Sequence, residues 1–186
     1  MFGIIVVGAS WGGLKALSCI VAGLPADFAI PIAIVQHRGR DGAGLLCDLL
    51  QERTPLRVTE VMDKEPVRPG HVYVAPPDYH TLVESGYFSL STEAPVRYSR
   101  PSIDVTFASA ADAYGAKAIG IVLTGANADG ADGLKRIADR GGLVLVQDPA
   151  GAESGIMPRA ALARVADAEV LALDAIAPFL ARVAKA

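Results

Sequence analysis

Short apolar runs alternate with helix-forming segments along most of this 186-residue chain. The runs are rich in Val and Ile, as buried parallel strands are, and the segments between them repeat apolar residues at helical spacing. This alternation predicts an α/β fold, a doubly wound and mostly parallel sheet flanked by helices. The expected strands are residues 4–7, 31–35, 57–61, 118–123, 143–146 and 168–173, and the expected helices are 14–21, 42–53 (with Asp41 as N-cap), 102–113 (with Ser102 as N-cap), 131–140, 159–165 and 175–183.

The middle of the chain departs from this alternation. Residues 70–76 form an expected strand that ends in a double proline, and residues 79–83 and 87–90 flank a Glu84-Ser85-Gly86 turn. Two short strands around such a turn predict an antiparallel β-hairpin excursion. Pro and Gly are spread through the connections rather than gathered in a linker, so we expect a single domain over residues 1–186.

Composition excludes several classes of protein. The net charge is −3, from 17 basic and 20 acidic residues without a basic cluster, which argues against a nucleic-acid partner. No apolar run approaches the ~20 residues of a membrane span, and no basic region precedes the N-terminal apolar stretch. Cys19 and Cys47 fall among apolar helix residues and are expected to be buried thiols. We therefore expect a soluble cytoplasmic protein with no metal and no cofactor, and the sequence leaves its oligomeric state open.

A glycine-rich loop follows the first expected strand. In Gly8-Ala9-Ser10-Trp11-Gly12-Gly13, Ser10 stands at the first turn of a helix, where unpaired backbone N–H groups can stabilise an anion. The spacing fits the glycine-x-serine-x-glycine pattern that exposes a nucleophilic serine. The same kind of loop can also cradle a phosphate or simply turn the chain, and this stretch alone leaves all three interpretations open.

Two further side chains follow neighbouring expected strands. His37 comes directly after residues 31–35, and Asp129 stands in the loop after residues 118–123. The carboxyl ends of parallel strands share one edge of the sheet, so Ser10, His37 and Asp129 are expected at the same edge. There the imidazole can draw the proton from the serine and the carboxylate can fix the imidazole tautomer. An aspartate before a helix is more often an N-cap, so spacing alone makes Asp129 only a candidate.

Several motifs along the chain carry a resemblance to a known family. They are Val6-Val7-Gly8-Ala9-Ser10 with Gly12-Gly13, Val35-Gln36-His37, Gly70 to Pro76, Arg100-Pro101-Ser102-Ile103-Asp104, Leu123-Thr124-Gly125 with Asp129-Gly130, and Gly155 to Ala161. This ordered series, which covers nearly the whole chain, resembles the catalytic domain of the chemotaxis protein-glutamate methylesterases (the CheB family).

The resemblance implies a function and a set of site residues. Ser10 matches the family's nucleophile, His37 its base and Asp129 its orienting carboxylate, while the backbone N–H of Trp11 is the expected oxyanion donor. The family demethylates glutamate γ-methyl esters on the cytoplasmic helices of chemoreceptors, and some members deamidate glutamine. Members usually carry an N-terminal receiver domain, whereas this chain starts three residues before its first expected strand. The resemblance therefore implies a stand-alone member or a catalytic piece.

The chain departs from the family around the expected pocket. Trp11 replaces a small hydroxyl residue, Arg38-Gly39 replaces methionine-proline, Ser99 replaces a histidine, and Ala126 replaces a methionine. We expect the oxyanion site and pocket to be formed by Trp11, Gly12, Gly13, Arg100 and Ala126. Four cations, either solvated or complementary to an acidic helical substrate, are expected near the mouth: Lys15, Arg38, Arg40 and Arg100.

Two other functions are compatible with parts of this sequence. The glycine-rich loop is similar to the dinucleotide loops of short-chain reductases, but the interval from Tyr114 to Lys117 is one residue too short for their active site. The stronger alternative is a non-catalytic relative that binds a receptor or another partner through the same edge.

Overall fold

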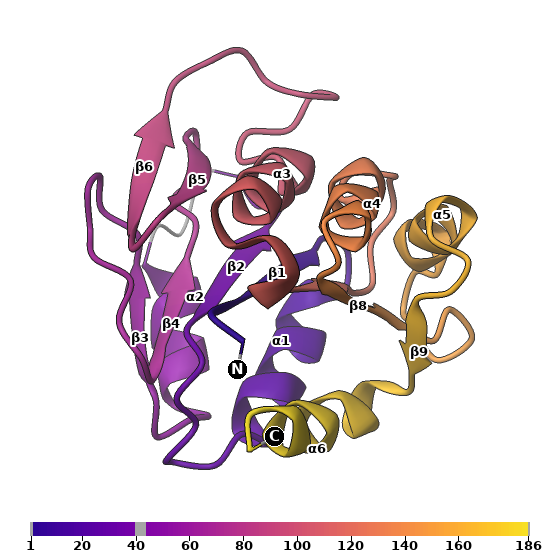
Figure 1. Cartoon of the computed structure of the whole chain (residues 1–186), viewed down its shortest axis with the longest axis horizontal. Coiled ribbons are helices and arrows are strands. Elements are labelled where there is room, and N and C mark those ends of the chain that lie inside the picture. The colour runs from indigo at the N-terminus through magenta and orange to yellow at the C-terminus, as the bar shows by residue number, and fades with distance from the viewer. Residues whose placement is uncertain (1, 40–43, 186) are drawn as a thin grey trace.

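A seven-stranded parallel sheet forms the centre of the computed structural model, which describes residues 2–39 and 44–185 (Figure 1). The strand order is β3-β4-β2-β1-β7-β8-β9. The strands are β1 (Ile4–Ala9), β2 (Ile32–Gln36), β3 (Arg57–Glu60), β4 (His71–Val74), β7 (Ala118–Val122), β8 (Leu143–Gln147) and β9 (Glu169–Leu171). The predicted doubly wound α/β fold is confirmed.

Strand β1 is the point where the order of the sheet reverses. It pairs in parallel with β2 on one side, in a register that sets Ala9 opposite Gln36, and with β7 on the other, where Gly8 is opposite Val122. The loops that follow these three strands therefore leave the sheet side by side, at the crevice where open α/β sheets bind ligands.

Helices cover both faces of the sheet (Figure 1). On one face lie α1 (Gly13–Ala22), α2 (Leu45–Gln51) and α6 (Leu173–Val183), and on the other lie α3 (Ile103–Tyr114), α4 (Ala131–Asp139) and α5 (Ile156–Arg164). The side chains of β1 alternate between the two layers: Ile5 and Val7 join the core with α1, whereas Ile4 and Val6 join the core with α3. A strand buried on both faces needs this continuous apolar run.

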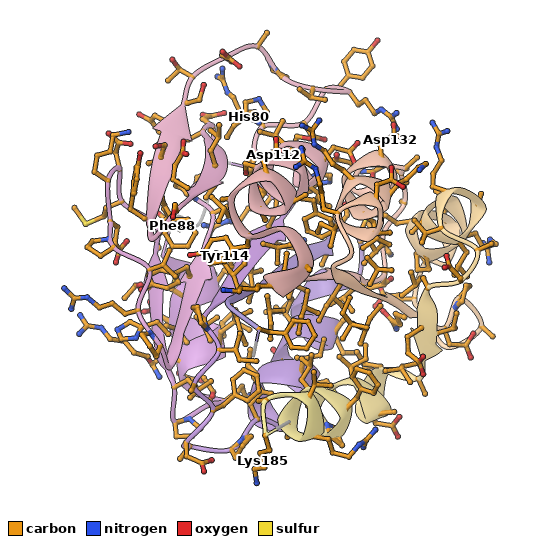
Figure 2. The ribbon with its side chains drawn as sticks, in the orientation of Figure 1. His80, Phe88, Asp112, Tyr114, Asp132 and Lys185 are labelled. Carbon is orange, nitrogen blue, oxygen red and sulfur yellow. The ribbon has the colours of Figure 1, made fainter. Side chains whose placement is uncertain are left out.

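The antiparallel excursion is confined to two strands. β5 (His80–Glu84) and β6 (Tyr87–Ser91) pair antiparallel as a separate hairpin against α3. Phe88 of this hairpin, labelled in Figure 2, is buried. Its ring centroid lies 4.8 Å from that of Tyr73 on β4. The strand expected at residues 70–76 belongs instead to the parallel sheet as β4, between β2 and β3.

The structure differs from the sequence-based expectation at one of the two cysteines. Cys47 is buried, which raises the pKa of its thiol to about 11, but Cys19 is exposed on the outer side of α1, contrary to the expectation. The expected N-cap Asp41, the first residues of its helix and Arg40 lie outside the described residues. Among the described residues, no helix combines the length and apolar character needed to cross a membrane.

Candidate active site

Backbone hydrogen bonds hold the turn around Ser10. The Ser10 N–H donates to the carbonyl of Thr124, 3.0 Å away, and the Ser10 carbonyl accepts the N–H of Gly13 at 2.9 Å. Gly12 has a φ of 77°, and a Cβ at this position would stand 2.7 Å from the Cβ of Glu153. The glycine therefore permits both the left-handed backbone and the close approach of the neighbouring loop. The turn ties the end of β1 to the loop after β7.

Gln36, whose role the sequence did not indicate, joins the first two loops of the site. Its side-chain Nε2 donates to the carbonyl of Ser10 at 2.8 Å and to the carbonyl of His37 at 2.9 Å. Because the Gln36 side chain is buried, these two bonds set the position of the Ser10 turn relative to His37.

The packing of Gln36 against α1 leads to a first prediction, for Gly13→Ala. A Cβ at position 13 would lie 1.8 Å from Oε1 of Gln36, whose amide is already held by its two hydrogen bonds. We expect this substitution to lower the free energy of unfolding by about 1–3 kcal/mol, the usual cost of overpacking. Urea unfolding measures this, with Gly151→Ala as the control because only one backbone atom, 3.9 Å away, lies near its Cβ. Equal losses in the two variants would contradict the prediction.

His37 and Asp129 are in direct contact. His37 follows β2, its N–H donates to the carbonyl of Ala9 at 3.1 Å, and its ring Nε2 lies 2.8 Å from Oδ2 of Asp129. The Asp129 side chain is only 2% exposed, and the His37 side chain is largely covered as well. A carboxylate that only accepts hydrogen bonds fixes the proton of a neutral imidazole on Nε2 and leaves the lone pair on Nδ1.

The Asp129 carboxylate also closes the N-terminus of α3. Beside His37 it accepts the backbone N–H groups of Ile103 at 2.7 Å and Asp104 at 2.9 Å, and the hydroxyl of Ser102 at 2.9 Å. Burial by itself raises the pKa of this carboxyl, but the hydrogen bonds from His37, Asp104 and Ile103 hold its pKa below the ordinary value. Asp129 is therefore an ionised group at the positive end of a helix.

This contact corrects two expectations about helix caps. Ser102 stands at the N-cap position of α3, yet its hydroxyl makes no capping hydrogen bond and donates instead to Asp129. Asp129 is indeed a cap, but the helix it caps is α3 and not α4, the helix that follows it in the sequence. The interpretations as a cap and as a partner of His37 are thus compatible.

Asp104 brings a second carboxyl close to Asp129. Burial and then the charge of Asp129 raise its pKa from 3.8 to about 6, although the Gly133 N–H donates to its Oδ1 at 2.7 Å. The folded state holds the Asp104 proton more tightly than the unfolded state. The free energy of unfolding therefore falls as the pH rises from about 4 through about 6.

The raised pKa yields a second prediction, for Asp104→Asn. The amide cannot ionise and its oxygen can still accept the Gly133 N–H. We expect a higher urea midpoint than wild type at about pH 7.5 and an unchanged midpoint at about pH 4. The exposed Asp27→Asn is the control. A difference between Asp104→Asn and wild type that stays the same at both pH values would contradict this assignment.

Asn127 contacts the other nitrogen of the His37 ring. Its Nδ2 lies 3.1 Å from Nδ1 of His37, and its Oδ1 accepts the backbone N–H of Asp129 at 3.0 Å. The sequence did not single out this residue, because a polar loop side chain carries no signal of its partner. Among the hydrogen bonds of the described residues, none joins the Ser10 hydroxyl to His37.

Ser10 and His37 line one open depression of 530 Å³. Trp11, 65% exposed, stands at its mouth, and the other expected pocket residues Gly12, Gly13 and Ala126 also line it. Arg100 does not: it lies in a neighbouring depression with Arg38 and His37, and its guanidinium donates to the carbonyls of Thr92 and Glu93. In this structure the pocket around Ser10 is therefore built without Arg100.

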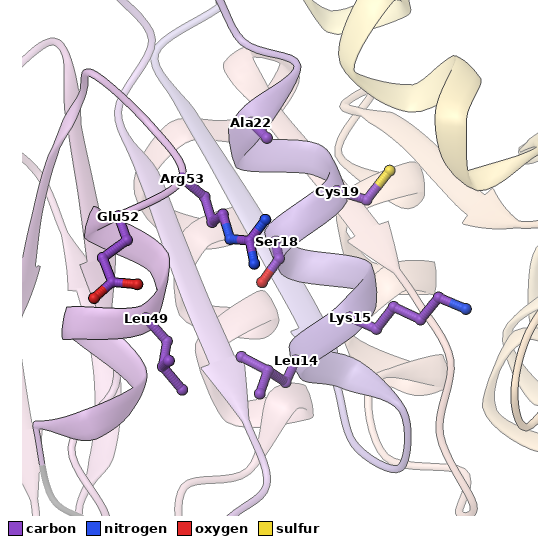
Figure 3. Close-up of a pocket in the computed structure, with 8 residues that line it drawn as sticks. All are labelled: Leu14, Lys15, Ser18, Cys19, Ala22, Leu49, Glu52 and Arg53. Carbon is purple, nitrogen blue, oxygen red and sulfur yellow. The ribbon is translucent and has the colours of Figure 1, made fainter.

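The expected cations have different surroundings. Lys15 is exposed and lines the Ser10 depression, whereas the guanidinium of Arg38 is mostly buried and donates to Glu60 at 2.6 Å. Leu14 and Lys15 line both this depression and a groove between α1 and α2, and Figure 3 shows the residues of that groove. The rest of that groove is lined by Ser18, Cys19, Ala22, Leu49, Glu52 and Arg53.

The other two histidines lie elsewhere. His80 (labelled in Figure 2) is buried, with Nε2 3.1 Å from the carbonyl of Ala94 and Nδ1 accepting the N–H of Ser102. His71 begins β4, at the opposite end of the strands, with Nδ1 2.9 Å from the carbonyl of Pro69. Within residues 2–39 and 44–185, no group of three or more His, Cys, Asp or Glu residues is arranged to hold a metal ion.

This chain is similar to known proteins in both sequence and fold. The CheB methylesterase family matches residues 5–180. A protein of Leptospira interrogans is 46% identical over 179 residues, which make up 96% of this chain and 93% of the relative. A protein-glutamate methylesterase/protein-glutamine glutaminase of Anaeromyxobacter dehalogenans is 41% identical over 93% of this chain and 51% of its own length, so the chain spans about half of that relative. The crystal structure of the Thermotoga maritima CheB methylesterase catalytic domain matches with a TM-score of 0.94 and 32% identity over 98% of this chain and 99% of that one.

Proposed function

This chain belongs to the CheB methylesterase family, and we propose that it is a serine hydrolase that demethylates glutamate γ-methyl esters on the cytoplasmic helices of a chemoreceptor. Residues 1–186 act in this proposal as one catalytic domain. The observation that carries it is the pair of His37 and the buried, ionised Asp129, set beside the Ser10 turn at one edge of the sheet.

The proposed reaction begins with the Ser10 hydroxyl. Its oxygen attacks the ester carbonyl carbon while Nδ1 of His37 accepts the proton, since Asp129 engages Nε2. The imidazolium then protonates the departing methanol, and an acyl-serine remains. Water hydrolyses this acyl group with the same roles in reverse, which regenerates Ser10 and releases the glutamate carboxylate.

The start of α1 supplies the proposed oxyanion site. Among the described hydrogen bonds, none takes the backbone N–H of Trp11 or Gly12, and both residues line the Ser10 depression. N–H groups at the positive end of a helix can stabilise the negative oxygen of a tetrahedral intermediate. The side chain of Trp11 is no obstacle to this role, because the donor is its backbone.

A glutamine side chain fits the same steps, with ammonia instead of methanol as the leaving group. The names of the Anaeromyxobacter dehalogenans relative include both activities, and we propose deamidation as a second reaction of the same site.

Methanol release from a methylated chemoreceptor fragment tests the proposed function. In parallel, a fluorophosphonate probe should form an adduct that mass spectrometry maps to the peptide containing Ser10. Adduct formation without methanol release would assign a serine hydrolase with another substrate. If neither occurs, the chain is better described as a non-catalytic binding relative.

A further inference from the structure

The nitrogen of His37 that the proposed reaction needs already has a hydrogen-bond partner. Asp129 engages Nε2, so only Nδ1 can accept a proton from Ser10, and the Asn127 side chain lies 3.1 Å from that atom. The orientation of the Asn127 amide is set independently. Because its Oδ1 accepts the Asp129 N–H at 3.0 Å, its NH₂ group must face the ring and donate to Nδ1.

This contact opposes proton transfer from the serine. The Nδ1 atom has a single lone pair in the plane of the ring, so the Ser10 hydroxyl and the Asn127 amide compete for it. Once Nδ1 is protonated, its N–H would face the N–H of the amide, and the contact would become repulsive. The interaction with Asn127 therefore stabilises the resting imidazole and not the imidazolium that forms during the reaction.

We propose that Asn127 is a latch on the general base, a positioning residue that holds His37 Nδ1 at rest and must release it before Ser10 can donate its proton. This inference rests on the proposed function. Asn127 is half-buried and stands between two exposed residues, Ala126 and Ala128. Ala126, the residue before Asn127, lines the Ser10 depression. A substrate bound there can offer the Asn127 amide another hydrogen-bond acceptor.

Two small substitutions at position 127 distinguish a residue that holds His37 Nδ1 from one that only supports the loop. Asn127→Ser keeps an oxygen that can accept the Asp129 N–H but lacks the amide that reaches the ring. Asn127→Asp keeps the size and this acceptor and replaces the donor with a carboxylate, which would favour a proton on Nδ1. The two variants should therefore change the reactivity of Ser10 in opposite directions.

The measurement is the rate at which a small fluorophosphonate labels Ser10, followed against pH. We expect Asn127→Ser to label about five-fold faster than wild type at neutral pH, the factor that corresponds to one neutral hydrogen bond. Asn127→Asp should label at least about ten-fold slower, and its rate should recover only at higher pH because the extra carboxylate stabilises the imidazolium. Urea unfolding of both variants checks that the fold is kept.

Nitrogen NMR of the His37 ring makes the test independent of activity. In wild type the Nδ1 resonance should be that of an unprotonated, hydrogen-bonded nitrogen, and it should move in Asn127→Ser. Labelling of Asn127→Ser that is equal to or slower than wild type, or an Nδ1 resonance that does not move, would overturn the latch. A wild-type protein that is not labelled at Ser10 would instead overturn the proposed function, while the NMR result would still decide whether Asn127 holds the ring.

Discussion

Asp129→Asn is expected to reduce methanol release by about four orders of magnitude, the scale of effect seen when an orienting carboxylate becomes an amide. Among the described residues, the Asp129 side chain accepts hydrogen bonds from four donors: Nε2 of His37, the N–H groups of Ile103 and Asp104, and the hydroxyl of Ser102. An asparagine has only one accepting atom, so its NH₂ must face at least one of these donors. Facing His37, it would favour the tautomer with the proton on Nδ1, where Ser10 needs a lone pair.

The same substitution should also destabilise the fold, because Asp129 caps α3. The NH₂ group replaces one of the two carboxylate oxygens, so it faces either the Ile103 N–H or the Asp104 N–H and leaves that donor without a partner, at a cost of about 1–3 kcal/mol. Urea unfolding measures the loss of stability and methanol release measures the loss of activity, both on the same preparation. Asp132→Asn, on the exposed side of α4, is the matched control. If Asp129→Asn released methanol at the wild-type rate, Asp129 would have no part in the proposed mechanism. If it were as stable as wild type, the proposal that Asp129 caps α3 would be wrong.

The fold could be predicted from the sequence because its signals are local. Residues such as Ile4–Val7 are buried on both faces of a parallel sheet, and this environment requires the continuous apolar run that identifies the strand. The shared edge of Ser10, His37 and Asp129 followed from the same pattern, since each residue comes after a parallel strand.

The partners of these residues could not be predicted in the same way. Gln36 is the last residue of a strand and Asn127 a residue of a polar loop, and neither position indicates that an amide will bridge two loops or meet an imidazole. Ser102 does occupy the N-cap position of α3, as its place before the helix indicates, but the carboxylate that accepts the first N–H groups of the helix belongs to Asp129, 27 residues away in sequence. Tertiary contacts of this kind depend on how the loops pack, and loop packing has no periodic signal.

Ser10→Ala is expected to abolish methanol release and fluorophosphonate labelling while leaving the stability nearly unchanged. The described hydrogen bonds of Ser10 all use its backbone: the N–H donates to Thr124, and the carbonyl accepts from Gly13 and from the side chain of Gln36. Alanine keeps each of these bonds and can adopt the same backbone, so we expect the free energy of unfolding to change by less than about 0.5 kcal/mol. Only the proposed nucleophile is lost.

The contrast with Asp129→Asn makes this variant the sharper test of the mechanism. Activity lost through Asp129 can arise from a displaced α3, whereas activity lost through Ser10 with an intact fold can arise only from the missing hydroxyl. We therefore expect Ser10→Ala to lose both methanol release and fluorophosphonate labelling, while its free energy of unfolding, measured in urea, stays that of wild type. Labelling that persists at another residue would show that the probe does not report on Ser10, and methanol release that persists would mean that a different group attacks the ester.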